Sequence, residues 1–158
     1  MIKVTGFPPF INEDSLVLVL GSFPSVKSRA QGFYYGNPQN RFWRACASFF
    51  SVPEPKTLDE KKDFLLRRRI ALWDIVTSCE IEGSSDASIQ NETIADIPAL
   101  VSRYPLKSIL CNGSKAFTLL AQHHSGLLPI SKRLCSTSPA NPRFSLEEWR
   151  LALQEVFS

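Results

Sequence analysis

Aromatic and amide side chains gather in one short segment of the sequence, residues 32–43. The segment reads Gly-Phe-Tyr-Tyr-Gly-Asn-Pro-Gln-Asn-Arg-Phe-Trp. Aromatic faces can stack on a flat ring, and amides both donate and accept hydrogen bonds, so together they can read the edge of that ring. Asn40 stands directly before a helical pattern, where free backbone N–H groups are available. These residue types predict a pocket for a base or a nucleotide.

Length and composition limit the class of protein. The 158 residues are 44% hydrophobic and 21% charged, which is typical of one domain with a real core, so we expect a single domain over residues 1–158. The longest apolar run, residues 16–20, is too short to cross a bilayer, and no signal-like stretch opens the sequence. We therefore expect a cytoplasmic protein with no membrane partner. The net charge of +3 permits DNA binding without establishing it.

The cysteines and histidines give no sign of a metal site. No two cysteines form a C-x-x-C pair, so a zinc or iron–sulfur centre is not expected. They are Cys46, Cys79, Cys111 and Cys135. The two histidines, His123 and His124, lie at the end of a helical pattern and far from every motif. We expect buried thiols, no metal and no cofactor.

Short apolar runs predict the strands of an α/β fold. Residues 15–21 form a continuous apolar run that ends in glycine, which is typical of a strand buried on both faces. Further strands are expected over residues 70–76, 108–111 and 133–135, each next to a helical pattern. Alternation of strands and helices favours an α/β sheet.

Helix starts are marked by the pattern S/T-x-x-E. Residues 57–60 and 145–148 both carry it, and we expect each to form a capping box. The apolar spacing predicts two further helices, over about residues 40–49 and 114–123, and an amphipathic last helix after Ser145.

Polar loops follow several of these strands. Residues 21–25 follow the first strand, residues 79–86 follow the second, and residues 136–142 follow the last. Ligands bind at the carboxyl ends of strands in open α/β sheets. Stiff loops with hydroxyl groups and free N–H groups can also hold phosphates. We expect these loops to lie at one edge of the sheet and to form walls of one pocket.

The order of these motifs resembles the uracil-DNA glycosylase superfamily, and within it the hypoxanthine-DNA (deoxyinosine) glycosylase branch. The likeness covers most of the chain, and its motifs are Gly6–Pro9, Leu20–Ser25, Tyr34–Trp43, Leu72–Asp74, Glu82–Ser84 and Ser136–Asn141. The resemblance implies a three-layer α/β/α sandwich around a four-stranded parallel sheet. It also implies that a damaged base is flipped out of duplex DNA and that its N-glycosidic bond is hydrolysed without a metal.

Two residues compete for the catalytic role. Phe23 occupies the place where other branches hold a catalytic Asp or Asn, and the resemblance moves that role to Asn40. An amide cannot act as a general base at neutral pH, so Asn40 would only orient the attacking water. The alternative is that Asn40 simply caps the following helix. Asp74 is a second candidate to activate water, with a buried structural carboxylate as its alternative.

The remaining candidates are assigned to the base or to the DNA. We expect base contacts from Gly21, Ser22, Phe23, Tyr35, Ser78 and Asn112. We expect DNA contacts from Ser25, Lys27, Arg41, Ser136, Ser138, Pro139, Ala140 and Asn141. Pro139 and Ala140 could form an apolar wedge, with a rigid loop that binds nothing as the alternative. Capping of the next helix is the alternative for Asn112.

Together these expectations describe a monofunctional DNA glycosylase of base excision repair that prefers hypoxanthine. Its partner would be double-stranded DNA with deaminated bases, and a monomer is expected. A uracil or mismatch glycosylase is one alternative, although Ser136 stands where several uracil enzymes have a histidine. A non-catalytic nucleic-acid-binding module of the same fold is another. The sequence contains no G-x-S-x-G elbow for a serine hydrolase.

Overall fold

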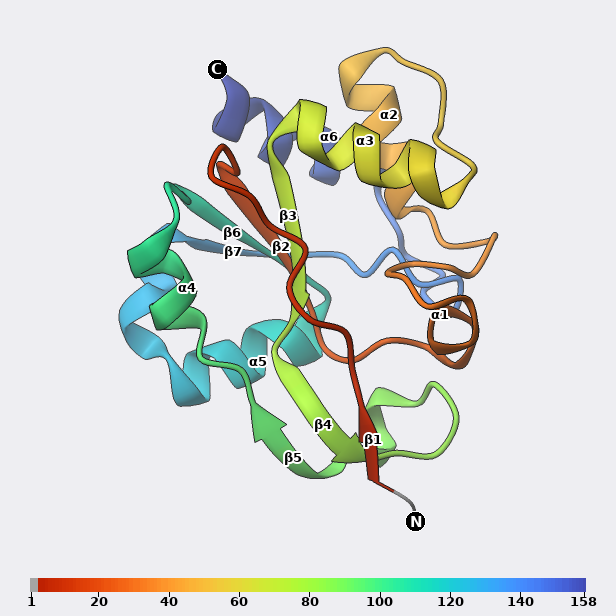
Figure 1. Cartoon of the computed structure of the whole chain (residues 1–158), viewed down its shortest axis with the longest axis vertical. Coiled ribbons are helices and arrows are strands. Elements are labelled where there is room, and N and C mark those ends of the chain that lie inside the picture. Colours follow the sequence, from red (N-terminus) through yellow and green to blue (C-terminus); the bar gives the residue numbers. More distant parts are fainter. Residues whose placement is uncertain (1–2) are drawn as a thin grey trace.

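The computed structural model describes residues 3–158 and is built on a four-stranded parallel sheet. The strand order is β3-β2-β6-β7 (Figure 1). These strands are Ile70–Asp74, Val17–Gly21, Ser108–Asn112 and Ser131–Leu134, respectively. The central strand β2 is buried along its whole length, because helices cover both of its faces. The predicted four-stranded parallel sheet is confirmed.

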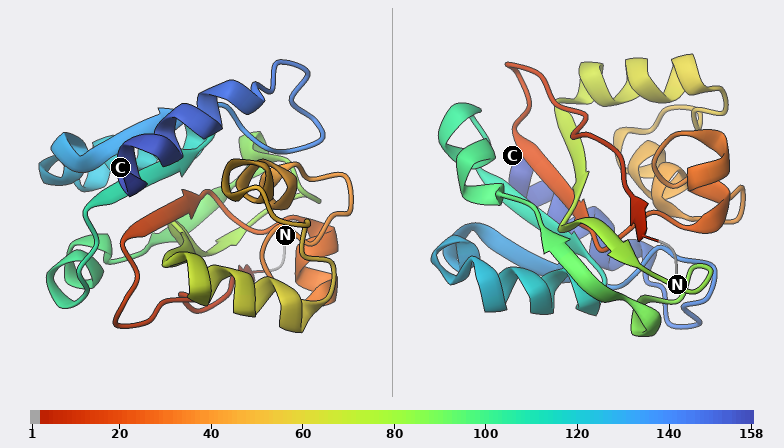
Figure 2. Two further views of the ribbon diagram at one scale, coloured as in Figure 1. Left: turned by 90° about the horizontal axis from the view of Figure 1, so that it is seen from above. Right: turned by 60° about the horizontal axis from the view of Figure 1, so that its bottom comes forward.

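Helices lie on both faces of this sheet (Figures 1 and 2). One face carries α2 (Phe42–Phe50), α3 (Leu58–Arg68) and α6 (Leu146–Phe157), and the other carries α4 (Ile97–Arg103) and α5 (Ser114–His123). Side chains alternate along β2, so Val17 and Val19 pack on the first group while Leu18 and Leu20 pack on the second. This arrangement confirms the α/β/α sandwich.

A second, antiparallel sheet adjoins the first and corrects one prediction. It consists of β1 (Lys3–Thr5), β4 (Val76–Glu80) and β5 (Gln90–Ile94), in the order β1-β4-β5. The single strand expected over residues 70–76 is wrong, because β3 ends at Asp74 and β4 begins at Val76 in the other sheet. The backbone N–H of Ile75 donates to the carbonyl of Gly21 at this change of sheet. Asp74 therefore closes the parallel sheet.

The helix starts were predicted well, with one correction. At α3 the Thr57 hydroxyl accepts from the Glu60 N–H, and the Glu60 carboxylate accepts from the Thr57 N–H, which completes the capping box. At α6 the Ser145 hydroxyl accepts from the Glu148 N–H. The Glu148 carboxylate, however, accepts from the backbone N–H of Cys135. The second capping box is therefore only half formed, because the Glu148 carboxylate accepts from the backbone just after β7 and not from the N-cap backbone.

Short elements complete the fold. They are α1 (Val26–Gln31), η1 (Asp86–Ser88) and η2 (Ser125–Ile130). α2 begins two residues later than expected, because the Asn40 N–H donates to the Asn37 carbonyl in a turn before the helix. α5 spans the predicted residues. Over residues 3–158, no helix has the length and apolar character needed to cross a membrane.

Candidate active site

A cavity of about 370 Å³ lies at the carboxyl ends of β2, β3 and β6. The loops after β2 and β7 form opposite parts of its wall, so the expectation that they share one edge of the sheet is confirmed. The predicted residues that line it are Gly21, Ser22, Phe23, Ser25, Tyr35, Asn40, Asp74, Asn112, Ser136, Ser138, Pro139 and Ala140. Ser84, just before η1, and Asp86, the first residue of η1, add the expected wall from residues 79–86.

Four predicted residues do not line this cavity. Ser78 lies in β4, where it pairs with Thr5 and Thr93 of the antiparallel sheet. Lys27 is exposed on α1. Arg41 donates from outside the last loop, residues 136–142, to the Asn141 carbonyl, and the Asn141 amide donates within that loop to the Ser136 carbonyl. Ser78 lies away from the cavity because the chain changes sheet at residue 75, which the single predicted strand did not show.

Three residues, Gly21, Tyr35 and Asp74, form what we call the cavity floor. Asp74 is only 5% exposed, and its Oδ2 atom has no hydrogen-bond partner among the described residues. The buried Tyr35 hydroxyl also has no partner within that part of the chain. A Cβ atom on Gly21 would clash with Asp74 Oδ1 and would lie 3.3 Å from the Tyr35 hydroxyl. Glycine at position 21 therefore lets both polar groups approach the same point.

Burial controls the protonation of the cavity floor. Burial, together with the smaller effect of the negative charge of Asp86, raises the pKa of Asp74 to about 7. Burial also raises the pKa of Tyr35 above its ordinary value, with the Asp74 charge acting in the same direction. The Ser22 hydroxyl donates to Asp86 Oδ1 over 2.7 Å, which fixes the acidic neighbour in place. Near neutral pH the Asp74 carboxyl can therefore exchange between its neutral and charged forms.

Asn40 lines the cavity and also supports the start of α2. Its Oδ1 atom accepts from the backbone N–H of Phe42 over 2.9 Å. Formally the residue at the helix N-cap is Arg41, which makes no side-chain cap bond. The two interpretations from the sequence, a helix-capping residue and a cavity residue, are thus compatible in this geometry.

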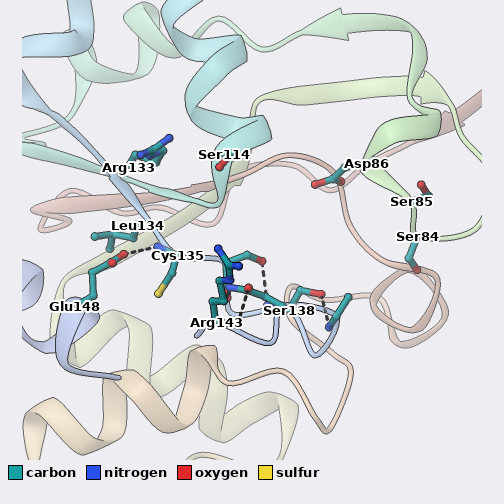
Figure 3. Close-up of a pocket in the computed structure, with 13 residues that line it drawn as sticks. Ser84, Ser85, Asp86, Ser114, Arg133, Leu134, Cys135, Ser138, Arg143 and Glu148 are labelled. Carbon is teal, nitrogen blue, oxygen red and sulfur yellow. Dashed lines mark hydrogen bonds between the residues drawn. The ribbon is translucent and has the colours of Figure 1, made fainter. Parts of the chain in front are cut away.

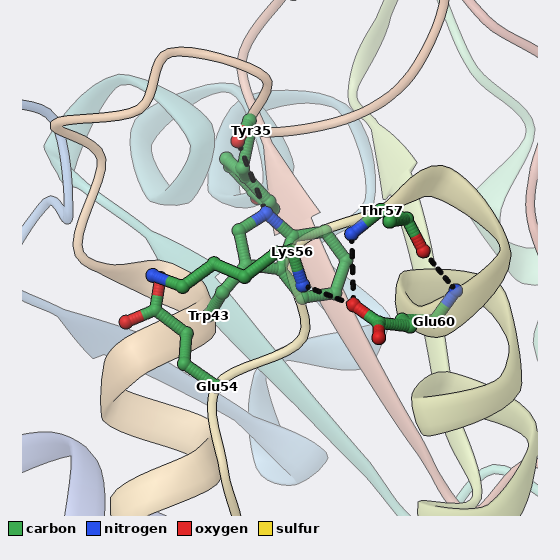
Figure 4. A network of polar contacts seen from close by, with 6 residues as sticks. All are labelled: Tyr35, Trp43, Glu54, Lys56, Thr57 and Glu60. Atoms are coloured by element: carbon green, nitrogen blue, oxygen red, sulfur yellow. Dashed lines mark hydrogen bonds and ion pairs between the residues drawn. The ribbon is translucent and has the colours of Figure 1, made fainter.

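The aromatic segment before α2 is anchored from outside the cavity (Figure 4). The indole N–H of Trp43 donates to the Tyr35 carbonyl over 3.0 Å and holds Tyr35 at its positive φ of 51°. Tyr34 and Tyr35 line the cavity, and the Tyr34 hydroxyl donates to the Pro8 carbonyl over 2.7 Å. Phe33 instead packs in the core beside Trp43. Two of the three consecutive aromatic residues are therefore available to a ligand.

Two side chains, Arg41 and Asn112, hold the last loop. Arg41 was expected to contact DNA and Asn112 to contact the base, but in the structure both form hydrogen bonds with this loop. The Arg41 guanidinium donates to the carbonyls of Ser138 and Asn141 and lies 4.5 Å from the Phe144 ring centre. Asn112 exchanges two 2.9 Å hydrogen bonds with Thr137, one in each direction. Capping of α5 by Asn112 is wrong, because its N-cap residue is Gly113 and no side chain caps it. Both side chains position the loop, Arg41 from outside the cavity and Asn112 from within its wall.

A groove of about 670 Å³ adjoins the cavity, and it contains residues that the sequence analysis missed (Figure 3). The groove and the cavity share Ser84, Asp86, Ser136, Ser138 and Ala140. Its further lining includes Arg133, Arg143 and Ser114 at the start of α5. The sequence could have indicated Arg133 and Arg143, because they stand on either side of the last loop, residues 136–142.

The comparisons with known proteins agree with this geometry. The family model described as "Uracil DNA glycosylase superfamily" matches residues 8–154. The chain belongs to this superfamily. A hypoxanthine DNA glycosylase of Methanosarcina acetivorans is 39% identical over 149 residues, which cover 92% of each chain. Another of Methanosarcina barkeri is 36% identical over 161 residues, which cover 99% of each. The resemblance seen in the sequence is confirmed.

A solved structure from the uracil DNA glycosylase superfamily shows the same fold. It is the solution NMR structure of a candidate uracil DNA glycosylase from Methanosarcina acetivorans, with a TM-score of 0.83 and 33% identity. The match covers 99% of this chain and 100% of that chain. Within residues 3–158 of this superfamily member, no group of three or more His, Cys, Asp or Glu side chains is arranged to hold a metal ion.

Phe23 gives this superfamily member an apolar patch of wall in its first motif. Its ring is 8% exposed, and the Arg29 guanidinium lies 5.7 Å from the ring centre. A Cβ on Gly6 would lie 3.2 Å from the ring, so the backbone there packs closely against it. Phe23 can therefore shape or stack on a ring in the cavity, whereas the polar groups are supplied by Asn40 and the cavity floor.

Proposed function

We propose that this protein is a monofunctional DNA glycosylase that releases hypoxanthine from deoxyinosine in duplex DNA. Its superfamily makes it a DNA glycosylase, a hydrolase that acts on N-glycosidic bonds. The finer assignment, hypoxanthine as the preferred base, is supported by two near full-length relatives that carry this name. A base within the duplex cannot be reached by such an enzyme, so the nucleotide must be flipped out of the stack.

The observation that carries the proposal is the cavity itself. Its volume of about 370 Å³ suits a purine, and its wall combines two tyrosines with amide and carboxyl groups. Aromatic side chains can stack on a flipped base, while amide groups can read its edge. Hypoxanthine pairs weakly in DNA, so the cost of extruding it, a few kcal/mol at most, is lower than for a well-paired base.

Asn40 is proposed to orient the attacking water. Its amide cannot remove a proton at neutral pH, so the rate must come from orientation and from stabilisation of charge in the transition state. The sugar acquires oxocarbenium character as the bond to the base breaks, and the leaving purine acquires negative charge. The hydrogen bond from Phe42 N–H fixes the Asn40 side chain and so supports this role.

The last loop is proposed to contact the duplex around the flipped nucleotide. Pro139 and Ala140 are exposed beside the cavity and could enter the space that the base leaves. Arg133 and Arg143 of the neighbouring groove are proposed to contact phosphates. Ser136, in place of a histidine, favours hypoxanthine over uracil.

The test is base release under single-turnover conditions, with EDTA present, from duplexes that carry one deoxyinosine or one deoxyuridine. Alkaline cleavage then reports each abasic site. Asn40→Ala and Asn40→Ser form a matched pair, because serine restores an acceptor for the Phe42 N–H but not the amide. We expect both variants to lose about 10²–10³-fold in rate, as for other groups that stabilise transition states.

The outcomes separate the alternatives. An active Asn40→Ser variant would reduce Asn40 to a helix cap. Release of uracil but not hypoxanthine by the wild type would be consistent with the superfamily but would contradict the proposal that hypoxanthine is the preferred base. Duplex binding without release of either base would indicate a non-catalytic binding module.

A further inference from the structure

The cavity floor contains two buried polar groups that the proposed role of Asn40 leaves unused. Asp74 Oδ2 and the Tyr35 hydroxyl both lack hydrogen-bond partners over residues 3–158. Most buried polar atoms in folded proteins are paired, because an unpaired one loses its hydrogen bonds to water without replacement. The Asp74 carboxyl group, through its Oδ1 atom, and the Tyr35 hydroxyl both lie beside Gly21, and all three residues line the cavity. A polar ligand in the cavity could therefore supply the missing partners.

The surroundings of Asp74 favour its neutral form. The loop before α2 supplies the hydroxyls of Tyr34 and Tyr35, η1 supplies the Asp86 carboxylate, and neither element supplies a cation against Asp74. Lys115 on α5 acts on Asp86 rather than on Asp74. Burial and Asp86 together raise the pKa of Asp74 to about 7. A neutral carboxyl group carries a proton that it can donate.

Position decides what such a donor would meet. The deoxyribose of a flipped nucleotide remains attached to the DNA backbone, so the sugar must stay near the mouth of the cavity. The base alone can reach the floor. A group on the floor therefore meets acceptor atoms of the base, whereas the water that attacks the sugar lies nearer the mouth.

We propose that Asp74, as a neutral carboxylic acid, donates its proton to an acceptor atom of the flipped purine, while the Tyr35 hydroxyl binds the same edge. This inference rests on the proposed function. In this role Asp74 is a general acid that assists departure of the base. The sequence analysis instead considered Asp74 as a carboxylate that activates water. Protonation lowers the negative charge that the leaving purine must carry.

The proton and electron balance is simple. The bond between the sugar C1′ atom and the purine N9 atom breaks, and its electron pair goes to the purine. The Asp74 proton moves to a purine acceptor, either N7 or the 6-oxygen. Water oxygen forms the new bond to C1′ and releases a proton to solvent, and Asp74 takes up a proton from solvent after the purine has left. Neither oxidation nor reduction takes place.

The experiment measures single-turnover release of hypoxanthine between pH 5 and pH 9 for the wild type, Asp74→Asn, Asp86→Asn and Tyr35→Phe. We expect the wild-type rate to fall above about pH 7, because the required proton is lost there. Asp74→Asn should lose about 10²-fold or more and should show no such fall. Asp86→Asn should move the fall to lower pH, because removal of a negative neighbour lowers the pKa of Asp74. Tyr35→Phe should lower the rate without removing the fall.

Each outcome decides between roles. Asp86→Asn keeps an acceptor for the Ser22 hydroxyl, so it tests the acid even if Asp74→Asn fails to fold. A wild-type rate that rises through pH 7 would make Asp74 a base for water and would overturn the inference. A flat profile, or a fall that Asp86→Asn does not move, would overturn it as well. Absence of hypoxanthine release at every pH would overturn the proposed function itself, and this inference with it.

Discussion

The Asp74 carboxyl group also affects stability, because its charged form is costly to bury. Its pKa rises from 3.8 to about 7 on folding. Between these two pH values the folded protein binds more protons than the unfolded chain, so stability falls as pH rises through this range. A shift of this size corresponds to roughly 4 kcal/mol when the shift is fully developed above pH 7.

Asp74→Asn should therefore make the protein more stable, and the gain should be clearly larger at pH 8 than at pH 5. The amide keeps the shape of the side chain but never has to carry a charge. Thermal or urea unfolding at both pH values measures the difference. Asp14→Asn, at an exposed position, is the control and should show no comparable gain. Equal effects of Asp74→Asn at both pH values would contradict the assigned cause.

At the scale of single residues, the sequence identified the types of group but not their partners. Asn40, Asp74 and Tyr35 follow from motif and position, and all three line the cavity. The lack of a hydrogen-bond partner for Asp74 Oδ2 among residues 3–158 could not be predicted. It depends on the tertiary structure, because no strand or loop in this range that packs against Asp74 places a donor within reach of this atom. The pairing of Asn112 with Thr137 joins residues 25 positions apart and is likewise a tertiary property.

At the scale of elements, the last loop is held by Asn112 at the end of β6 and by Arg41 just before α2. The Arg41 guanidinium donates to three carbonyls of this loop, those of Thr137, Ser138 and Asn141, while it lies over the Phe144 ring. Lysine cannot reproduce a planar group with several donors. We expect Arg41→Lys to resemble Arg41→Ala rather than the wild type in base release.

The rate of base release should fall more than tenfold in both Arg41 variants, because displacement of a positioning group by about 1 Å can lower a rate by about 10²-fold. Amide hydrogen exchange of residues 136–142 measures the cause directly and should become faster. Arg44→Ala, one turn along on the exposed side of α2, is the matched control. Unchanged exchange with reduced DNA binding would instead assign Arg41 to a phosphate.

Elements with local signals were predictable, and the others were not. Thr57 and Glu60 define the start of α3 through contacts within four residues. The division between β3 and β4 has no local signal, because Ile75 and Val76 continue an apolar run with no glycine or proline. Glu148 also departs from its local pattern, since the Cys135 N–H competes for it. Competition between distant groups cannot be read from spacing alone.

For the whole molecule, a net charge of +3 gives little general attraction to DNA, so local cations should dominate. Arg133 and Arg143 stand in the groove beside the cavity. Each phosphate contact that is lost reduces the slope of log K against log salt by about 1. Arg133→Ala and Arg143→Ala should each show this reduction.

Fluorescence anisotropy with an undamaged duplex at several salt concentrations measures the slope. Arg67→Ala on α3 is the control, because this side chain is exposed outside the groove and pairs with Asp63. Equal slopes for all three variants and the wild type would place the DNA elsewhere on the surface.

The cavity wall is assembled from stretches that are far apart in the chain, from Gly21 near one end to Ala140 near the other. During synthesis the ribosome delivers the floor and the aromatic segment long before the last loop. A growing chain that stops before residue 136 lacks the part of the cavity wall that the last loop forms. It also lacks the carbonyls of that loop that accept hydrogen bonds from Arg41. The complete cavity therefore forms only after residues 136–140 have been made and have folded onto the earlier strands.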